Sequence, residues 1–316
     1  MGINIEPLGP LFGAKVSGCD LGNLDERTFL DIRGALVEHE LLVFEGQPIT
    51  ADDQVAFGRM FGDLSVSPFS PSSDEVPELI VLDNHGEAPR PLTDVWHSDE
   101  TFRAEPPMAT ILRSRISPQF GGDTMFASMT AAYDALSDRM KQYLAGLTAT
   151  HGHGRFGQIL ADDPERLHIL QRVQREHPVA HHPVVRIHPE SGRSAIFVNA
   201  HFTTRIDGLS DDESSAILDF LLRQPLVAEF QVRVSWRPDQ LVMWDNRSVQ
   251  HYAPNDYLPQ RRRMERVTIR GDKPIGDGSS DGPVTAVRGI EPRHTGTSIG
   301  GDGREVAATR AMGSDR

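Results

Sequence analysis

The sequence predicts a mainly β fold in which helices pack outside a sandwich or barrel of strands. Short runs rich in β-branched and aromatic residues recur along the chain, and amphipathic helical segments separate them. The sequence contains no Walker or CxxC pattern and no repeat with a period of roughly 20–50 residues. Because a P-loop has no support, strands interrupted by helical insertions favour a β-sandwich or barrel.

Helices are predicted where apolar residues recur at helical spacing and a capping residue stands at the start. Thr50 precedes one such segment, and Ser210 with Glu213 forms a capping pattern before another. The predicted helices cover residues 24–38, 51–60, 131–147, 165–175 and 210–222. Clusters of β-branched and aromatic residues predict strands. These strands cover residues 41–44, 79–82, 110–112, 183–187, 195–198, 230–236, 241–244 and 267–269.

The length of 316 residues fits one large domain or two small ones. The composition changes near Pro274, since the following segment is rich in Gly, Ser and Asp and has no periodic run of apolar residues. Such a segment buries too little surface to offset its ordering entropy. We expect one domain over residues 1–274 and a flexible tail over residues 275–316.

The charge balance restricts the partners of the chain. With 32 basic and 45 acidic side chains, the formal net charge is −13, which repels both a phosphate backbone and an anionic membrane surface. Nucleic acid and membrane are therefore not expected as partners. The only lysines are Lys15, Lys141 and Lys273, so nearly every cation is a planar guanidinium suited to binding carboxylates. Small organic anions are the ligands that this composition favours.

The single cysteine, Cys19, cannot form an internal disulfide, so the chain needs no oxidising compartment. The first ten residues lack the basic opening and apolar run of a signal peptide. No apolar run approaches the ~20 residues needed to span a bilayer. We therefore expect a cytoplasmic protein.

Three residues form a candidate metal site. His97 and Asp99 are two positions apart, and on an extended segment this spacing places both side chains on one face. His251 follows a predicted strand and a polar turn and supplies a second imidazole. Two imidazoles and one carboxylate form the facial triad typical of Fe(II), which leaves positions open for a cosubstrate and dioxygen. Zinc tolerates the same ligands.

A row of arginines after His251 predicts an anion-binding surface. On a strand, Arg262, Arg266 and Arg270 share one face, together with Met264 and Thr268. A row of guanidiniums on one face is unfavourable unless anions pair with it, so carboxylate or sulfonate ligands are expected.

The sequence resembles the Fe(II)/2-oxoglutarate-dependent dioxygenases typified by taurine dioxygenase and 2,4-dichlorophenoxyacetate dioxygenase. The resemblance covers residues 11–274 and is carried by five motifs: Trp96-His97-Ser98-Asp99, Gly121-Gly122-Asp123-Thr124, His182-Pro183-Val184-Val185-Arg186, Trp244-Asp245-Asn246-Arg247 through His251, and Arg262 with Arg266 before Gly271-Asp272-Lys273-Pro274. It implies a double-stranded β-helix (jelly roll) core with flanking and inserted α-helices, and a homo-oligomer, either dimer or tetramer.

The resemblance also implies the roles of individual residues. His97, Asp99 and His251 hold Fe(II). Arg262 binds the far carboxylate of 2-oxoglutarate and Thr124 assists by hydrogen bonding, while Arg266 grips the anionic group of the substrate. The implied reaction consumes O2, converts 2-oxoglutarate to succinate and CO2, and hydroxylates a small organic anion.

The segment after Asp63-Leu64 departs from the taurine branch. Ser67 and Ser70 stand where that branch has histidines and a tyrosine that help to bind the aminosulfonate. Smaller side chains widen a pocket, so these serines predict a bulkier substrate of the alkylsulfonate, alkyl sulfate or aryloxyalkanoate type. His151 and His153 are further candidates to line the same cavity.

Two alternatives remain open from the sequence. The same triad fits a zinc-bound jelly-roll hydrolase or lyase, and the arginine row fits a non-catalytic module that binds anions. Arg262 with Thr124 favours the dioxygenase, because only a 2-oxoglutarate enzyme needs a second anion anchor beside the metal.

Overall fold

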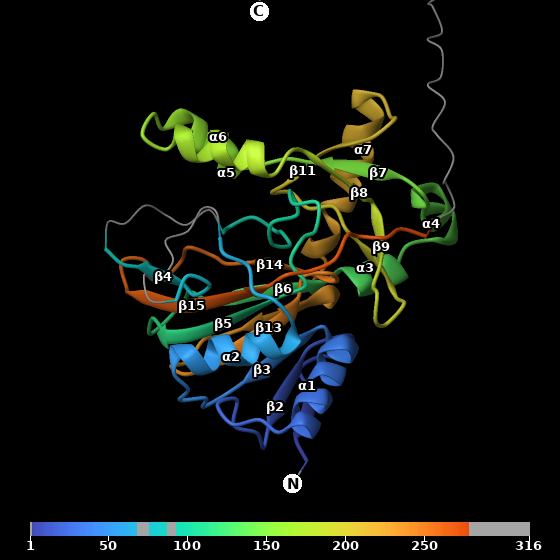
Figure 1. Cartoon of the computed structure of the whole chain (residues 1–316). Coiled ribbons are helices and arrows are strands. Elements are labelled where there is room, and N and C mark those ends of the chain that lie inside the picture. Colours follow the sequence, from blue (N-terminus) through green and yellow to red (C-terminus); the bar gives the residue numbers. More distant parts are fainter. Residues whose placement is uncertain (1, 68–75, 87–92, 278–316) are drawn as a thin grey trace, which may run out of the picture. The chain divides into compact units, whose positions relative to one another are not determined.

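The computed structural model describes residues 2–67, 76–86 and 93–277 (Figure 1). Its largest sheet has seven strands in the order β1-β2-β3-β13-β5-β15-β4. The β2 and β3 strands are parallel, and the other neighbouring pairs are antiparallel. The strands are β1 (Asn4–Pro7), β2 (Ala14–Ser17), β3 (Leu41–Phe44), β4 (Ile80–Asn84), β5 (Ala109–Ile116), β13 (Leu241–Asp245) and β15 (Arg262–Ile269).

Both faces of the seven-stranded sheet are covered. Successive side chains of a strand point to opposite faces. On β3, Leu42 and Phe44 therefore join one hydrophobic cluster, whereas Leu41 and Val43 join another. Residues from two helices complete the first cluster, and these helices lie on the same side of the sheet (Figure 1). They are α1 (Glu26–His39) and α2 (Ala51–Phe61).

A second sheet packs on the other face. It has three antiparallel strands in the order β12 (Gln231–Val234), β6 (Thr124–Ser128) and β14 (Val249–Tyr252). Phe126 of this sheet packs in one buried cluster with Trp244 and Met264 of the large sheet. The two sheets therefore form a sandwich, as the residue pattern predicts, with helices on its outer side.

The remaining elements lie outside these two sheets, and they fall between β6 and β12 in the sequence. Two small sheets pair β11-β7-β8 and β10-β9. Their strands are β7 (Thr148–His151), β8 (Ala180–Pro183), β9 (Val185–Ile187), β10 (Ser194–Ile196) and β11 (Thr203–Ile206). The helices are α3 (Met129–Asp134), α4 (Asp138–Leu144), α5 (Gly154–Asp162), α6 (Leu167–Glu176) and α7 (Asp211–Leu221), with 3₁₀ turns at Gln224–Leu226 and Ala228–Phe230.

The prediction of one helix over residues 131–147 is wrong. The structure divides this segment into α3 and α4, because Ser137 leaves the helical conformation and its hydroxyl accepts a hydrogen bond from the backbone N–H of Met140. Ser137 is thus an N-cap inside an apolar pattern that continues across both helices. The α5 helix was not predicted, since no Ser, Thr, Asp or Asn stands at its start, where His153 is the N-cap.

Several strands are longer than predicted or were missed. The segment predicted at 267–269 is the end of β15, which begins at Arg262, because arginines and a glutamate interrupt its apolar run. The residue pattern does not predict β1, β2, β6 or β11. The described residues end at Asp277, and residues 278–316 of the predicted tail lie outside them. Within the described ranges, no helix has the length and apolar composition needed to cross a membrane.

Candidate active site

The structure brings His97, Asp99 and His251 together. His97 forms an antiparallel bridge with His251 of β14, with backbone N–H to O=C distances of 3.1 and 2.8 Å. This bridge places the two imidazoles side by side. Asp99 Oδ1 lies 4.0 Å from His97 Nε2 and 3.9 Å from His251 Nε2. One potential ligand atom from each residue lies within 4.8 Å of the others, and all three residues are buried.

Asp99 reaches this position by a different route from the one predicted. The extended segment expected over 97–99 is interrupted, because the chain turns at Asp99 and Glu100, where Glu100 has a φ of 46°. The expected strand therefore extends only to the bridge at His97, although the side chains of His97 and Asp99 do meet, 4.0 Å apart. The bridge to β14 places His97 and the turn places Asp99.

Burial keeps both imidazoles neutral, as metal ligands must be. It lowers the pKa of His97 to about 3 and the pKa of His251 to about 4. His97 Nδ1 lies 2.7 Å from the carbonyl oxygen of Val95, which can only accept, so Nδ1 carries the proton and Nε2 keeps a lone pair. This donor set fits a divalent iron ion.

Asp99 is held as a carboxylate. Burial alone would raise its pKa, but Arg266 and the two imidazoles reverse this effect and hold the pKa below its usual range. Arg266 Nη2 lies 3.0 Å from Asp99 Oδ1, and Arg266 Nε donates to the hydroxyl of Thr268. The candidate metal site therefore carries a negative charge from Asp99 at neutral pH.

One cavity joins the two histidines to the predicted anion-binding residues. Thr124, Arg262 and Arg266 line it together with His97 and His251. The other lining residues are Leu82, Asn84, Thr93, Leu112, Trp244, Ala253, Pro254, Asn255 and Tyr257. The cavity thus combines candidate metal ligands, two guanidiniums and an apolar wall.

Arg262 is a buried cation that lies beside two aromatic rings. Its guanidinium carbon lies 5.8 Å from the ring centres of both Trp236 and Tyr257, and its Nε donates to the carbonyl oxygen of Gly122. Within the part of the chain that the structure describes, no carboxylate lies within ion-pair distance of Arg262. A buried guanidinium without a protein counter-ion is unfavourable, so this residue favours an anionic ligand.

Gly122 makes room for this arginine. Its φ is +69°, and an added Cβ would lie 2.9 Å from Pro118 Cγ and 3.2 Å from Arg262 Cδ. A side chain at this position would therefore both strain the backbone and displace the guanidinium. This close approach explains why position 122 of the Gly-Gly-Asp-Thr motif is a glycine.

Trp236 orients the hydroxyl of Thr124. The indole N–H of Trp236 donates to Thr124 Oγ1 at 2.9 Å, and an indole nitrogen cannot accept. Thr124 therefore keeps its own hydroxyl proton for another acceptor. Trp236 and Tyr257 were not predicted as site residues, because a neutral aromatic residue in a strand or loop is usually a core residue.

Other predicted residues lie elsewhere. Arg270 is exposed beyond the end of β15 and lines different hollows from the triad cavity. His151, His153 and Ser67 do not line the described part of that cavity. His151 is instead buried against the hydroxyl of Thr101. Ser70 lies outside the described residues.

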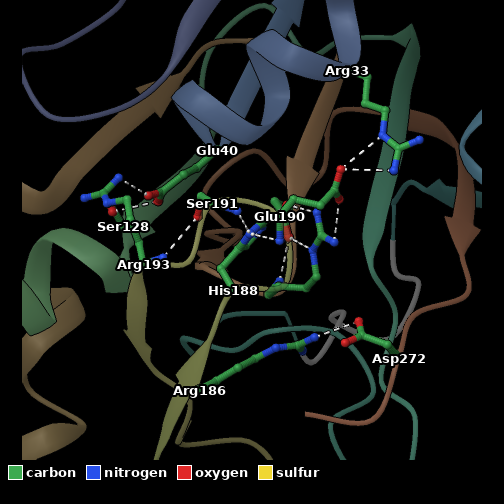
Figure 2. Close-up of polar contacts among 11 residues, drawn as sticks. Arg33, Glu40, Ser128, Arg186, His188, Glu190, Ser191, Arg193 and Asp272 are labelled. Atoms are coloured by element: carbon green, nitrogen blue, oxygen red, sulfur yellow. Dashed lines mark hydrogen bonds and ion pairs between the residues drawn. The ribbon is translucent and has the colours of Figure 1, made fainter. Parts of the chain in front are cut away.

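A buried ion-pair network anchors the turn between β13 and β14. Asp245 accepts two hydrogen bonds from the Arg247 guanidinium, at 2.8 and 2.6 Å, and its Oδ2 lies 2.9 Å from His188 Nε2. Arg247 also pairs with Glu190. Glu190 in turn pairs with Arg33 of α1 (Figure 2). The network fixes the segment that leads from Trp244 to His251.

Comparisons with known proteins agree with this geometry. Residues 4–268 match the family described as "Taurine catabolism dioxygenase TauD, TfdA family". The chain is 34% identical to the alkylsulfatase of Acinetobacter baylyi over 288 residues, which is 90% of each chain. It is 34% identical to the alpha-ketoglutarate-dependent sulfate ester dioxygenase of Pseudomonas putida, over 87% of this chain and 91% of that protein.

A solved structure has the same fold. The crystal structure of a taurine dioxygenase from Burkholderia xenovorans superposes with a TM-score of 0.75 at 32% identity. The match covers 88% of this chain and 94% of that one. Sequence and fold therefore point to the same group of proteins.

Proposed function

Because the chain belongs to the TauD/TfdA family and is an Fe(II)- and 2-oxoglutarate-dependent dioxygenase, we propose that His97, Asp99 and His251 hold its iron. The observation that carries this assignment is that their ligand atoms meet beside a cavity lined by Arg262 and Arg266. The alternatives of a zinc hydrolase and of a non-catalytic module lose their support with the family assignment.

When bound, iron and 2-oxoglutarate supply the oxidation of a substrate C–H bond, with O2 consumed and succinate and CO2 released. The protein's part is orientation. Arg262 pairs with the far carboxylate of 2-oxoglutarate through parallel N–H groups. Thr124 donates its remaining hydroxyl proton to the same carboxylate, because its oxygen already accepts from Trp236.

Arg266 is proposed to bind the anionic group of the substrate. It lines the cavity beside the histidines, and Leu82, Leu112 and Pro254 give the cavity an apolar wall. The relatives whose names specify sulfate esters favour an alkyl sulfate as the substrate class, with alkylsulfonates and aryloxyalkanoates as further candidates. Hydroxylation at the carbon that bears the sulfate oxygen gives a product that breaks down to an aldehyde and free sulfate.

The experiment that tests this proposal measures succinate release with Fe(II) and 2-oxoglutarate. The panel contains taurine, longer alkylsulfonates, alkyl sulfates, aryloxyalkanoates and the uncharged alcohols that match them. We expect alkyl sulfates to stimulate release more than taurine and to yield sulfate and aldehyde in equal amounts. If taurine is the best substrate, the inference from Ser67 and Ser70 is wrong, and if the alcohols match the anions, the role of Arg266 is wrong.

We also propose that the two facing sheets form a double-stranded β-helix, that the protein is cytoplasmic and that it is a homo-oligomer. The face-to-face packing around Phe126 supports the first point, and the single cysteine is in keeping with the second. The third rests on the family resemblance, and light scattering on the purified full chain tests it.

A further inference from the structure

The carboxylate of Asp99 closes a ring of hydrogen bonds. Thr110 Oγ1 donates to Asp99 Oδ2 at 2.6 Å, and Asn246 Nδ2 donates to Thr110 Oγ1 at 3.0 Å. Asn246 Oδ1 in turn accepts from the backbone N–H of Asp99 at 3.2 Å. All three residues are buried. The ring therefore has no water-exposed member that could exchange its partner for solvent.

Trp244 fixes the direction of every hydrogen bond in the ring. Its indole N–H donates to Asn246 Oδ1 at 3.0 Å, and that nitrogen can only donate. The amide oxygen of Asn246 must therefore face Trp244 and Asp99, and its NH2 group must face Thr110. Since Thr110 Oγ1 accepts from this group, the proton of its hydroxyl points to Asp99 Oδ2.

The ring is also held by the backbone on both sides. Thr110 lies in β5, where it pairs with Trp244 of β13 and Thr268 of β15. The backbone N–H of Asn246 donates to the carbonyl oxygen of Met108 at 2.8 Å. The ion pair between Asp245 and Arg247 flanks Asn246 on either side in the sequence. Both partners of Asp99 are thereby anchored through their backbone.

We propose that Thr110 and Asn246 are positioning residues that make Asp99 a one-oxygen ligand. This inference rests on the proposed metal role of Asp99. With Oδ2 committed to Thr110, only Oδ1 faces the two imidazole Nε2 atoms. A carboxylate that could rotate or bind through both oxygens would occupy a position that 2-oxoglutarate or dioxygen needs. The ring thus sets both the affinity for iron and the number of open positions.

The test compares Thr110→Val with Thr110→Ser and with Thr130→Val in the full chain. Valine keeps the shape of threonine and removes the hydroxyl, whereas serine keeps the hydroxyl. Thr130 is the matched control, because it is equally buried and its hydroxyl bonds another buried carboxylate, that of Glu40 in the core. Two quantities are measured without oxygen: the Kd for Fe(II), and the charge-transfer absorption of the complex of iron with 2-oxoglutarate.

Loss of such a partner of a metal ligand typically lowers metal affinity by about 10- to 100-fold, and we expect this range for Thr110→Val, with a shifted absorption band. Thr110→Ser restores both readouts, and Thr130→Val leaves both as in the parent protein. A second variant, Asn246→Asp, removes the donor to Thr110 and is expected to weaken iron binding as well, which keeps the test valid if Thr110→Val does not fold.

The proposal is overturned if Thr110→Val and Asn246→Asp are folded and bind iron as the parent protein does. It is also overturned if Thr110→Ser is as impaired as Thr110→Val, since the hydroxyl would then not matter. A different result would show that the metal assignment itself is wrong: the parent protein would then bind iron no better than its His251→Ala variant.

Discussion

Arg266 Nη2 lies 3.0 Å from Asp99 Oδ1, the carboxylate oxygen that faces both imidazoles. One guanidinium therefore contacts the candidate metal ligand and also lines the substrate cavity. A substrate anion that binds Arg266 must share this cation with Asp99. Substrate binding and the charge at the metal site are thereby coupled through one side chain.

Replacement of Arg266 tests this coupling. Loss of a charge-assisted hydrogen bond costs about 1.5–3 kcal/mol, so Arg266→Gln is expected to raise the KM for an anionic substrate by roughly 10- to 150-fold. The KM for 2-oxoglutarate should change much less, because Arg262 is intact. Steady-state kinetics with varied substrate and fixed cosubstrate measures the effect. If Arg266→Gln raised the KM for 2-oxoglutarate as much as the KM for the substrate, the proposed role of Arg266 in binding the substrate would be wrong.

Replacement of Arg262 is expected to act on the cosubstrate. Arg262→Ala removes the buried cation and should weaken 2-oxoglutarate binding by roughly 10- to 150-fold. Thr124→Val should have a smaller effect, since it removes one neutral donor. Arg261→Ala is the matched control, because Arg261 is an exposed neighbour that pairs with Asp83. An anaerobic titration with 2-oxoglutarate measures the affinity of each variant for the cosubstrate. An unchanged affinity in Arg262→Ala would refute the role of Arg262.

The residue types, together with the family resemblance, indicated His97, Asp99, His251, Arg262 and Arg266, and the structure brings these five side chains together. The neutral partners were not predictable. Thr110 bonds Asp99 only because strand register places it opposite Trp244, and Asn246 acts through an amide whose orientation an indole decides. Such roles depend on strand pairing between distant segments, which the sequence pattern does not specify.

The same limit explains the errors in the fold. A local apolar pattern indicates a helix over residues 131–147 but does not show that Ser137 caps a second one. Likewise, even spacing on β15 groups Arg270 with Arg262, whereas the strand ends at Ile269 and leaves Arg270 exposed. The ends of helices and strands depend on hydrogen bonds, and the spacing of apolar residues does not reveal where these form.

Buried histidines should make the iron-free fold sensitive to acid. Burial lowers the pKa of His151 to about 3 and of His182 to about 4, as it does for His97 and His251. The unfolded chain takes up these protons near pH 6.5, so the stabilisation by neutral burial is complete above that pH and is lost as the pH falls toward 4. Each group contributes a slope of up to about 1.4 kcal/mol per pH unit.

Denaturant unfolding of the iron-free protein between pH 4.5 and pH 8 measures this dependence. We expect a nearly constant free energy of unfolding above pH 7 and a steep decline below pH 6.5. His182→Gln should flatten the decline, because its imidazole no longer takes up a proton on unfolding. A flat profile in the parent protein would show that these imidazoles are not buried in the neutral form.

The central claim is that His97, Asp99 and His251 bind one iron ion in a cavity shared with 2-oxoglutarate. An anaerobic titration with Fe(II) in the presence of 2-oxoglutarate tests it most directly, with the parent protein, His251→Ala and the exposed control His181→Ala compared side by side. We predict one iron per chain and a charge-transfer band in the parent and in His181→Ala, and neither in folded His251→Ala. One iron per chain and an unchanged band in His251→Ala would contradict the account.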